Sequence, residues 1–470
     1  MDVEFEAPEY QADGSLLPVR YRFQGSTEAG WMVLREGKPA LELGPGYRLL
    51  RSERCGVCST DLARRFLPFP LPQITGHEVV ALDEHGKRYA VEINAPPIAR
   101  GIETDCPFCR LMPNHCPDRL VLGIHDLPGG FGPYVLAPIH ALHSIPDEID
   151  DDAAVLIEPL AAALHGVATI GPQAGQSIAV LGPRKLGMLA VAALAGWRRQ
   201  RNVDVCIVAM ARRPDLLAIA REMGADEAID TTSGAVPKVD VVIDCTGSPE
   251  GLEMAIEAAR SEVHLKSTHG RPAAGLRHLT ELVVDELSIA RFDPERLPPA
   301  LSGDRPLIGW LAGGQPPADL AARADVRFAY SAASVLDRLE DHPPPGSLPR
   351  VDAAVVKSVR GVELAIRPSE NREVSVVRPR GAILLDKGSE EDYAASPLLR
   401  AVWERGLRLT SSRCGDFAAA IALLSADERL RAAAPRLITH RFPAAETAKA
   451  FEAAAGRASI KALVEHEVER

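Results

Sequence analysis

The sequence predicts a mixed α/β chain in two parts, a β-rich domain with long loops and a doubly wound parallel sheet. Residues 1–150 carry many prolines and glycines, and their apolar runs are short, as in "YRLLRSERC". This texture is typical of an irregular β domain. From Asp151 onward, short apolar strands alternate with helical segments. Because these strands lack polar alternation, we expect a parallel sheet covered by helices on both faces.

The elements of the second part follow in chain order. A helix is predicted over 151–171, because two acids begin it, alanines dominate it and a glycine ends it. The expected strands are "SIAVLG", "VDVCIVAMA" and "VDVVIDCTG", with the helices "LGMLAVAALAGWRRQ" and "PDLLAIAREMG" between them. The C-terminal residues from 437 predict a strand, a helix and a final strand.

Residues 293–350 break this rhythm with repeated prolines ("RLPPAL", "GGQPPADL", "DHPPPGSLP"). We expect an insertion or an extra α/β unit here. After it, "VDAAVVKSVRGVELAI" (351–366) loosely echoes "VDVVIDCTGSPEGLEMAI" (239–256). The echo marks either a duplicated strand–helix unit or a chance similarity between two buried strands, and from sequence we slightly prefer chance.

Composition narrows the class of protein. The net charge is −11 with acids and bases mixed, whereas nucleic-acid binding needs a basic face. The first ten residues are acidic and lack the apolar core of a signal peptide. The apolar stretches 153–171 and 178–197 are interrupted by charged residues and proline, so neither predicts a membrane span. We expect a soluble cytoplasmic protein without nucleic-acid or membrane partners.

The glycine-containing turn after "SIAVLG" is a candidate dinucleotide site. Gly182 and Gly187 lie between a predicted buried strand and a predicted helix. There the free N–H groups of the helix N-terminus would receive a pyrophosphate. Arg184 stands where a middle glycine would let the backbone approach phosphate, so the motif alone is weak.

The next strand indicates which cofactor would bind. A carboxylate at its end would hold the ribose 2′-hydroxyl of NAD, but Ala211 is followed by Arg212 and Arg213. Paired guanidinium groups suit a 2′-phosphate, which favours NADP over NAD. The plain alternative is a solvated basic loop.

Cysteine, histidine and acidic residues form the second candidate site. There are eight cysteines, five of them between 55 and 116, too few for a disulfide scaffold in a chain of 470 residues. "RCGVCSTD" (54–61) precedes "ITGHEVV", "DCPFCRLMPNHC" and "IEPLAAALHG". The order "GVCSTD", "GHE", "EPLAAALHG" and a glycine turn resembles the zinc-dependent medium-chain dehydrogenase/reductase superfamily, in its polyol, threonine and glucose dehydrogenase branch.

The resemblance covers about 1–292 and 380–470. It implies a GroES-like catalytic domain at 1–165 and 415–470, and a Rossmann nucleotide-binding domain at 166–414 that includes the extra segment. It also implies roles for six residues. These are a thiolate ligand of catalytic zinc at Cys58, an imidazole ligand at His77, an adjacent carboxylate able to ligate at Glu78, an acid that ligates zinc or its water at Glu158, a proton-relaying hydroxyl at Thr60 and an orienting carboxylate at Asp61.

The residue types fit these implied roles independently. Catalytic zinc needs three protein ligands of N, S or O type and one open position. Bound zinc lowers the pKa of an alcohol, hydride passes to nicotinamide, and Thr60 takes the proton. Cys55 is then not a ligand. A redox pair of Cys55 and Cys58 would need a helix start after a strand, which the nearby sequence does not predict, and a zinc ribbon shared with Cys106 and Cys109 would have too wide a spacing.

A second metal lobe is less complete. "ETDCPFCRLMPNHC" resembles the four-cysteine structural zinc lobe of the family but keeps three: Cys106, Cys109 and Cys116. Glu103 stands in the first position, and Glu103, Asp105 or His115 would have to complete the tetrahedron. The alternative is a lobe that has lost its metal.

The leading hypothesis is therefore an alcohol dehydrogenase acting on a polyol, sugar or amino alcohol with NADP, or with NAD. A homo-oligomer is expected only by analogy. A non-catalytic or regulatory relative is the alternative, based on Arg184, the incomplete lobe and residues 293–350. A zinc-free reductase of the same superfamily is a third option, which the intact Cys58, His77 and Glu78 argue against.

Overall fold

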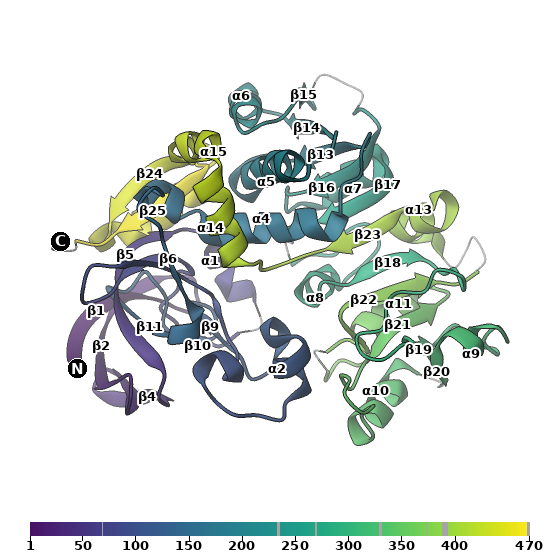
Figure 1. Cartoon of the computed structure of the whole chain (residues 1–470), viewed down its shortest axis with the longest axis horizontal. Coiled ribbons are helices and arrows are strands. Elements are labelled where there is room, and N and C mark those ends of the chain that lie inside the picture. Colours follow the sequence, from purple (N-terminus) through teal and green to yellow (C-terminus); the bar gives the residue numbers. More distant parts are fainter. Residues whose placement is uncertain are drawn as a thin grey trace. The chain divides into compact units, whose positions relative to one another are not determined.

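The computed structural model describes residues 1–67, 69–232, 236–267, 270–328, 331–372, 374–387 and 393–467 (Figure 1). The chain divides into unit 1, Met1–Ala162 with Cys414–Arg470, and unit 2, Ala163–Arg413. From the sequence we expected the first segment of unit 1 to end at residue 165, three residues later than observed. We expected its second segment to begin at residue 415, one residue later than observed.

Unit 1 contains an antiparallel meander, a three-stranded sheet and a seven-stranded sheet. The meander is β1 (Asp2–Tyr10), β2 (Leu16–Ser26), β3 (Gly30–Arg35) and β4 (Lys38–Leu43). The three-stranded sheet is β8 (Asn94–Ala95), β9 (Leu120–Leu122) and β10 (Asp126–Leu127). The seven-stranded sheet is β5 (Tyr47–Gly56), β6 (Glu78–Leu82), β7 (Arg88–Val91), β11 (Tyr134–Pro138), β12 (Leu142–Ser144), β24 (Ile438–Pro443) and β25 (Lys461–Glu465).

The strand order in the seven-stranded sheet is β12-β7-β6-β5-β25-β24, with β11 also on β5. The C-terminal β25 is antiparallel to β5, with Leu463 opposite Gly56, and Gly56 also lies opposite Glu78 of β6. The C-terminal strand β25 therefore lies one strand away from the "GHE" strand β6, with β5 between them.

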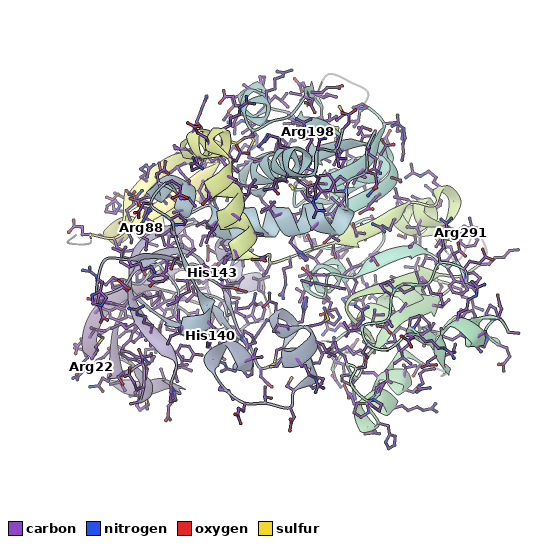
Figure 2. All side chains as sticks on the ribbon, in the orientation of Figure 1. Arg22, Arg88, His140, His143, Arg198 and Arg291 are labelled. Atoms are coloured by element: carbon purple, nitrogen blue, oxygen red, sulfur yellow. The ribbon has the colours of Figure 1, made fainter. Side chains whose placement is uncertain are left out.

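Short helices complete unit 1. They are α1 (Ser59–Leu62), η1 (Arg64–Phe66), η2 (Pro97–Arg100), α2 (Pro107–Leu111), η3 (Pro113–His115), η4 (Ile139–Ala141), α3 (Asp151–Ala154), α14 (Phe417–Ala426), α15 (Glu428–Ala433), η5 (Ala434–Leu437), η6 (Ala444–Glu446) and α16 (Thr447–Ala455). Arg88, labelled in Figure 2, joins β7 to α3 through a 2.8 Å contact with Asp151.

The helix predicted over 151–171 is broken into α3 and α4 (Ile157–Ile170), which crosses the boundary between the units. Pro159 explains the break, because proline has no N–H and is tolerated only in the first turn of a helix. Restarting the helix at Ile157 puts Pro159 in that first turn.

Unit 2 holds one eleven-stranded sheet in the order β15-β14-β13-β16-β17-β23-β18-β22-β21-β19-β20. Its strands are β13 (Ser177–Leu181), β14 (Cys206–Ala211), β15 (Glu227–Asp230), β16 (Val239–Asp244), β17 (Ala259–Leu265), β18 (Ser288–Arg291), β19 (Leu307–Trp310), β20 (Asp325–Phe328), β21 (Val351–Val356), β22 (Val377–Leu385) and β23 (Arg408–Ser411). All described pairs are parallel except β18 with β23. The predicted α/β fold with a parallel sheet is confirmed.

The helices of unit 2 are α5 (Lys185–Arg201), α6 (Pro214–Glu222), α7 (Pro249–Ala258), α8 (Leu279–Val284), α9 (Leu320–Arg323), α10 (Ala332–Asp341), α11 (Val359–Ile366) and α13 (Pro397–Arg405). Residues 293–350 thus contribute β19, α9, β20 and α10, which extend the sheet. Within the described part of the chain, no helix has the length and apolar character needed to cross a membrane.

Asp244 ends β16 as a buried acid, only 1% exposed. Its Oδ1 accepts hydrogen bonds from the Thr246 N–H (2.9 Å) and Oγ1 (2.7 Å). Burial raises the pKa of Asp244 to about 6, against the lowering effect of these two bonds. The folded protein therefore keeps a proton that the unfolded chain loses near pH 3.8.

This shift predicts a fall in stability as pH rises from about 4 to about 6. In this range the folded state binds more protons than the unfolded state. Each unit of pH therefore lowers the free energy of unfolding by up to about 1.4 kcal/mol, or by about 3 kcal/mol across the whole range. Asp244→Asn should remove that slope, and the exposed Asp204→Asn should keep it. Urea unfolding of the three proteins at pH 4 and pH 7 measures it, and an unchanged slope in Asp244→Asn would contradict the assignment.

Candidate catalytic metal site and nucleotide site

Asp61 organises the segment that carries Cys58 and Thr60. Its buried carboxylate accepts hydrogen bonds from the Cys58 N–H (2.8 Å) and the Gly76 N–H (3.2 Å). These bonds fix the start of α1 and the residue before His77. Cys58 and Thr60 are both partly exposed, and Cys58 Sγ lies 3.7 Å from Thr60 Oγ1.

His77 is buried and faces Asp61 and Cys58. Its Nδ1 lies 3.5 Å from Asp61 Oδ1, and no hydrogen-bond partner is found for that nitrogen among the described residues. Burial opposes protonation, but the facing charges of Asp61 and Cys58 outweigh it and raise the pKa of His77 well above its ordinary value. The same charges that favour the protonated form of the buried imidazole would also stabilise a bound cation.

Glu78 is held by Lys461, a residue that sequence reasoning missed. Both carboxylate oxygens contact the Lys461 ammonium, at 2.7 and 2.5 Å, and both side chains are almost fully buried. Burial opposes the charge on Lys461, yet Glu78, Cys58 and Glu158 raise its pKa. No local signal marks Lys461, because 383 residues separate it from Glu78.

Gly56 makes room for this ion pair. A Cβ built on Gly56 would lie 2.0 Å from Glu78 Oε2. Any larger residue would push the carboxylate off Lys461, so the glycine of "RCGVC" is needed for space.

Cys55 lies apart from the candidate ligands. It is fully buried in β5, and a Cβ on Gly76 would come within 2.7 Å of its sulfur. Burial raises the pKa of the Cys55 thiol well above its ordinary value. A buried, protonated thiol is a packing residue, not a ligand.

The donor set around Cys58 fits zinc. It offers the Cys58 thiol, the His77 imidazole, whose Nδ1 faces Asp61, and the Glu158 carboxylate in the first turn of α4. The charge of Glu158 acts on Lys461, as the charge of Cys58 does. These donors are less tightly gathered than those of the three-cysteine lobe, the only described group of three whose ligand atoms lie mutually within 4.8 Å.

That lobe brings Cys106, Cys109 and Cys116 together. Cys116 Sγ lies 3.4 Å from Cys109 Sγ and 3.9 Å from Cys106 Sγ. Burial and the neighbouring Cys109 raise the pKa of Cys116 to about 12. Of the three suggested fourth ligands, Glu103 and Asp105 are exposed and His115 is buried. Three sulfurs at these distances fit a tetrahedral zinc site that lacks one donor.

The glycine turn of unit 2 joins β13 closely to α5. Gly182 has φ +78°, a conformation that favours glycine. A Cβ on Gly187 would lie 2.6 Å from the Gly182 carbonyl oxygen, so α5 packs closely against the end of β13. Arg184 occupies the N-cap position of α5.

Three arginines differ in their surroundings near this turn. Burial lowers the pKa of Arg184, and the charge of Arg213 lowers it further. Arg213 is already paired in bidentate fashion with Asp215. Arg212 is exposed and makes no ion pair with a residue that the structure describes. A 2′-phosphate would therefore meet Arg212 as the available cation.

The sequence is similar to known alcohol dehydrogenases. Residues 44–147 match the alcohol dehydrogenase GroES-like domain family. An L-threonine 3-dehydrogenase of Chelativorans sp. (strain BNC1) is 27% identical over 249 residues, covering 50% of this chain and 67% of the relative. A sorbitol dehydrogenase of Halalkalibacterium halodurans is 28% identical over 243 residues, covering 48% and 69%.

Solved structures share the fold. L-idonate 5-dehydrogenase from Escherichia coli K-12 superposes with a TM-score of 0.56 at 15% identity, over 99% of both chains. A Sinorhizobium meliloti 1021 protein described as a zinc-binding dehydrogenase, with NADP bound, gives 0.54 at 19% identity, over 98% of this chain and 99% of that one.

Residues 44–147 thus form an alcohol dehydrogenase GroES-like domain, and the rest of the chain is similar in sequence and fold to medium-chain dehydrogenases. The similarity to threonine and sorbitol dehydrogenases indicates an oxidoreductase of the alcohol dehydrogenase class.

The Lys461–Glu78 pair predicts a strong and asymmetric effect on stability. Lys461→Met leaves an unpaired buried carboxylate and should cost about 3–5 kcal/mol of unfolding free energy. Lys461→Met combined with Glu78→Gln should recover most of this loss, because no charge remains buried. Chemical denaturation of the single and double variants tests this. A double variant as unstable as the single one would show that the charge pair is not the cause.

Proposed function

We propose that the chain is a zinc-dependent NAD(P)-linked dehydrogenase that oxidises a polyol, sugar or amino alcohol by hydride transfer, with preference for NADP. The observation that carries this proposal is the juxtaposition of Cys58, His77 and a hydroxyl at Thr60 under one organising carboxylate, Asp61. The threonine, sorbitol and idonate dehydrogenases among its relatives support the substrate class.

Cys58, His77 and Glu158 would hold the zinc, and the fourth position would stay open for substrate. When bound, zinc supplies a Lewis acid that lowers the pKa of the substrate alcohol. Glu78, with both oxygens on Lys461, acts as a buried charge partner and not as a ligand. Asp61 orients the Cys58 backbone and faces His77 Nδ1, as outer-shell carboxylates do at metal sites.

Thr60 moves the proton. Its Oγ1 lies beside Cys58 Sγ and is partly exposed, so it can accept the proton of the substrate hydroxyl and pass its own to solvent. The neighbouring Ser59 is exposed, which leaves this side of α1 open to water.

The cofactor would be held by the N-terminus of α5 and by arginines at the end of β14. Gly182 allows the tight turn and Gly187 allows α5 to pack against the end of β13, which would bring the N-terminus of α5 to the pyrophosphate, and Arg184 would meet it as a cation. Arg212 would receive the 2′-phosphate.

The remaining parts of the proposal concern the second zinc and the compartment. Cys106, Cys109 and Cys116 would hold a structural zinc with a fourth donor from the lobe. A cytoplasmic location is supported by the eight cysteines, all of which are free.

The central test compares Cys58→Ser with Cys55→Ser. Cys58→Ser should lose one zinc per chain, and activity should fall by more than the roughly 10–100-fold typical of outer-shell changes. Cys55→Ser should keep zinc and activity apart from a packing loss. Zinc content and NADP-dependent oxidation of a panel of polyols, sugars and amino alcohols are measured for both. Inactivation by Cys55→Ser alone, or an inactive and zinc-free wild type, would refute the proposal.

Cofactor choice is tested at the arginines. Arg212→Gln should weaken NADPH binding by about tenfold and leave NADH nearly unchanged, because it removes one charge-assisted contact to the 2′-phosphate. Arg213→Gln should have a smaller effect, since Asp215 already neutralises Arg213. Nicotinamide fluorescence titration measures each affinity. Equal losses for both cofactors would remove the basis for NADP preference.

A further inference from the structure

The eleven-stranded sheet of unit 2 contains two arrays that run in opposite directions. Strands β15-β14-β13-β16-β17-β23 form one parallel array, and β18-β22-β21-β19-β20 form the other. The two meet at the antiparallel pair of β23 with β18, where Ile289 lies opposite Leu409. Figure 1 shows both arrays within one continuous sheet.

Five of the six strands of the first array have a counterpart among the five described strands of the second, and β15 has none. In the first array, the first strand in the chain, β13, lies between β14 and β16. In the second array, the corresponding strand β19 lies between β20 and β21. The pairing register is also the same. Ile178, the second residue of β13, lies opposite Val241, and Ile308, the second residue of β19, lies opposite Ala353. The next strand pair has an irregular register at the same place in both arrays. In the pair of β16 with β17 it follows Val239, and in the pair of β21 with β22 it follows Val351.

Side chains repeat as well. Asp240 Oδ2 accepts a 2.8 Å hydrogen bond from the first N–H of β13, at Ser177, and Asp352 Oδ2 accepts a 2.8 Å bond from the first N–H of β19, at Leu307. The following helices begin alike. Ser248 and Ser358 cap α7 and α11 by accepting from the N–H three residues on, at 3.0 and 3.1 Å.

These repeats settle the meaning of the echo between 239–256 and 351–366. The two segments occupy equivalent positions, have the same register and make the same contacts. Chance similarity between two buried strands does not predict matching hydrogen bonds to a third strand. The structure favours duplication, against the preference drawn from sequence.

The end strands of the two arrays are exchanged. β18 follows β17 in the chain but lies beside β22, whereas β23 follows β22 but lies beside β17. Val263 pairs with Leu409, and the equivalent Ile383 pairs with Ile289. Ile289 and Leu409 are thus equivalent residues, and they face each other at the junction. This is the pattern of an isologous twofold interface, here within one chain.

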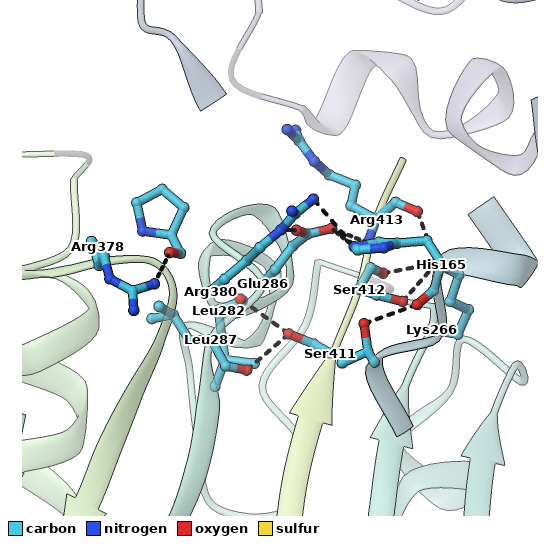
Figure 3. A network of polar contacts seen from close by, with 12 residues as sticks. His165, Lys266, Leu282, Glu286, Leu287, Arg378, Arg380, Ser411, Ser412 and Arg413 are labelled. Carbon is cyan, nitrogen blue, oxygen red and sulfur yellow. Dashed lines mark hydrogen bonds and ion pairs between the residues drawn. The ribbon is translucent and has the colours of Figure 1, made fainter. Parts of the chain in front are cut away.

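The junction is buried and held by polar contacts. Ile289 and Leu409 are both fully buried in one apolar core that runs through both arrays. Glu286, just before β18, accepts from the Arg413 N–H (2.6 Å) and from Arg380 Nε of β22 (2.5 Å), and contacts His165 Nε2 of α4 at 3.1 Å (Figure 3). The second array therefore packs on the first as a permanent partner.

The second array lacks the phosphate-binding turn. With Ser177 matched to Leu307, Ala312 stands at the position of Gly182 and Pro317 at that of Gly187. Gly187 lies in the 17-residue α5, whereas β19 is followed by a loop and by α9, which has four residues. Phe292 and Leu297, which precede β19 in the chain, pack partly buried against the small apolar core formed by residues of β19, β21 and β22. Between β19 and β20, where residues 311–324 are all described, the four-residue α9 is the only helix, so this turn does not offer the N-terminus of a long helix to a pyrophosphate.

We propose that residues 288–407 are a duplicated dinucleotide-binding half that has lost its nucleotide site and serves as a built-in partner subunit. It covers the edge of the first array that a second copy of the chain would otherwise cover. Each chain then binds one dinucleotide and forms one internal dimer interface. The inference of one bound dinucleotide per chain rests on the proposed function, whereas the inference of an internal dimer interface does not.

A deletion tests the interface. Removing residues 288–407 joins Leu287 to Arg408 at equivalent positions and keeps β23 on β17, with its outer edge bare. A bare edge strand with a buried leucine should pair with a second copy, so the number of chains per particle, measured by light scattering, should double relative to the full chain. An unchanged number of chains would overturn the partner role.

The full chain supplies an independent test that does not depend on folding of the deletion variant. NADPH titration should give one site per chain, and two sites would overturn the loss of the second nucleotide site. Gly187→Ala should weaken NADPH binding at least tenfold, and the equivalent Pro317→Ala should leave it unchanged. Weakening by Pro317→Ala would also overturn it. If NADPH did not bind at all, the proposed function would be contradicted, and the chain count would still decide the interface.

Discussion

The buried ion pair between Lys461 and Glu78 is the interaction on which the candidate metal site depends. It joins the C-terminal strand β25 to the first residue of β6, one residue after His77. Two charges in a nearly dry environment are costly apart and acceptable only together. The pair therefore requires that the last strand of the chain be in place before the "GHE" segment can hold its geometry.

Charge balance explains why this lysine is needed. Cys58, Asp61, Glu78 and Glu158 bring several potential negative charges into one region, and Lys461 and His77 are the cations that face them. Lys461 neutralises Glu78 and leaves Cys58, His77 and Glu158 as the donors that a divalent cation would satisfy. The same excess of anions raises the pKa of His77, since the site stabilises any positive charge placed in it.

The internal repeat in unit 2 changes the meaning of residues 293–350. As an insertion they would be peripheral, but they belong to the second array, whose strand β18 covers the edge that β23 would expose. An antiparallel contact between two parallel arrays is the signature of a twofold axis, and here both arrays come from one chain. The exchange of β18 and β23 makes the two halves inseparable, because each completes the sheet of the other.

Much of the chemistry could be predicted from sequence because it is written in local patterns. The α/β alternation, the glycine turn, Cys58 with Thr60 and Asp61, and the three-cysteine lobe all lie within short segments whose spacing carries the signal. The proline at 159 also lies in the sequence, but its effect on the helix depends on which turn it occupies.

The sequence by itself determined the fold class, the two-part organisation and the candidate ligand types, since each depends on the period or spacing of neighbouring residues. Only the tertiary structure decided that Lys461 neutralises Glu78 and that Asp215 forms an ion pair with Arg213. It also decided that the similar segments 239–256 and 351–366 lie at equivalent positions in one sheet. These facts depend on contacts between residues far apart in the chain or on the direction of a side chain, and strand pairing across a sheet leaves no trace in local spacing.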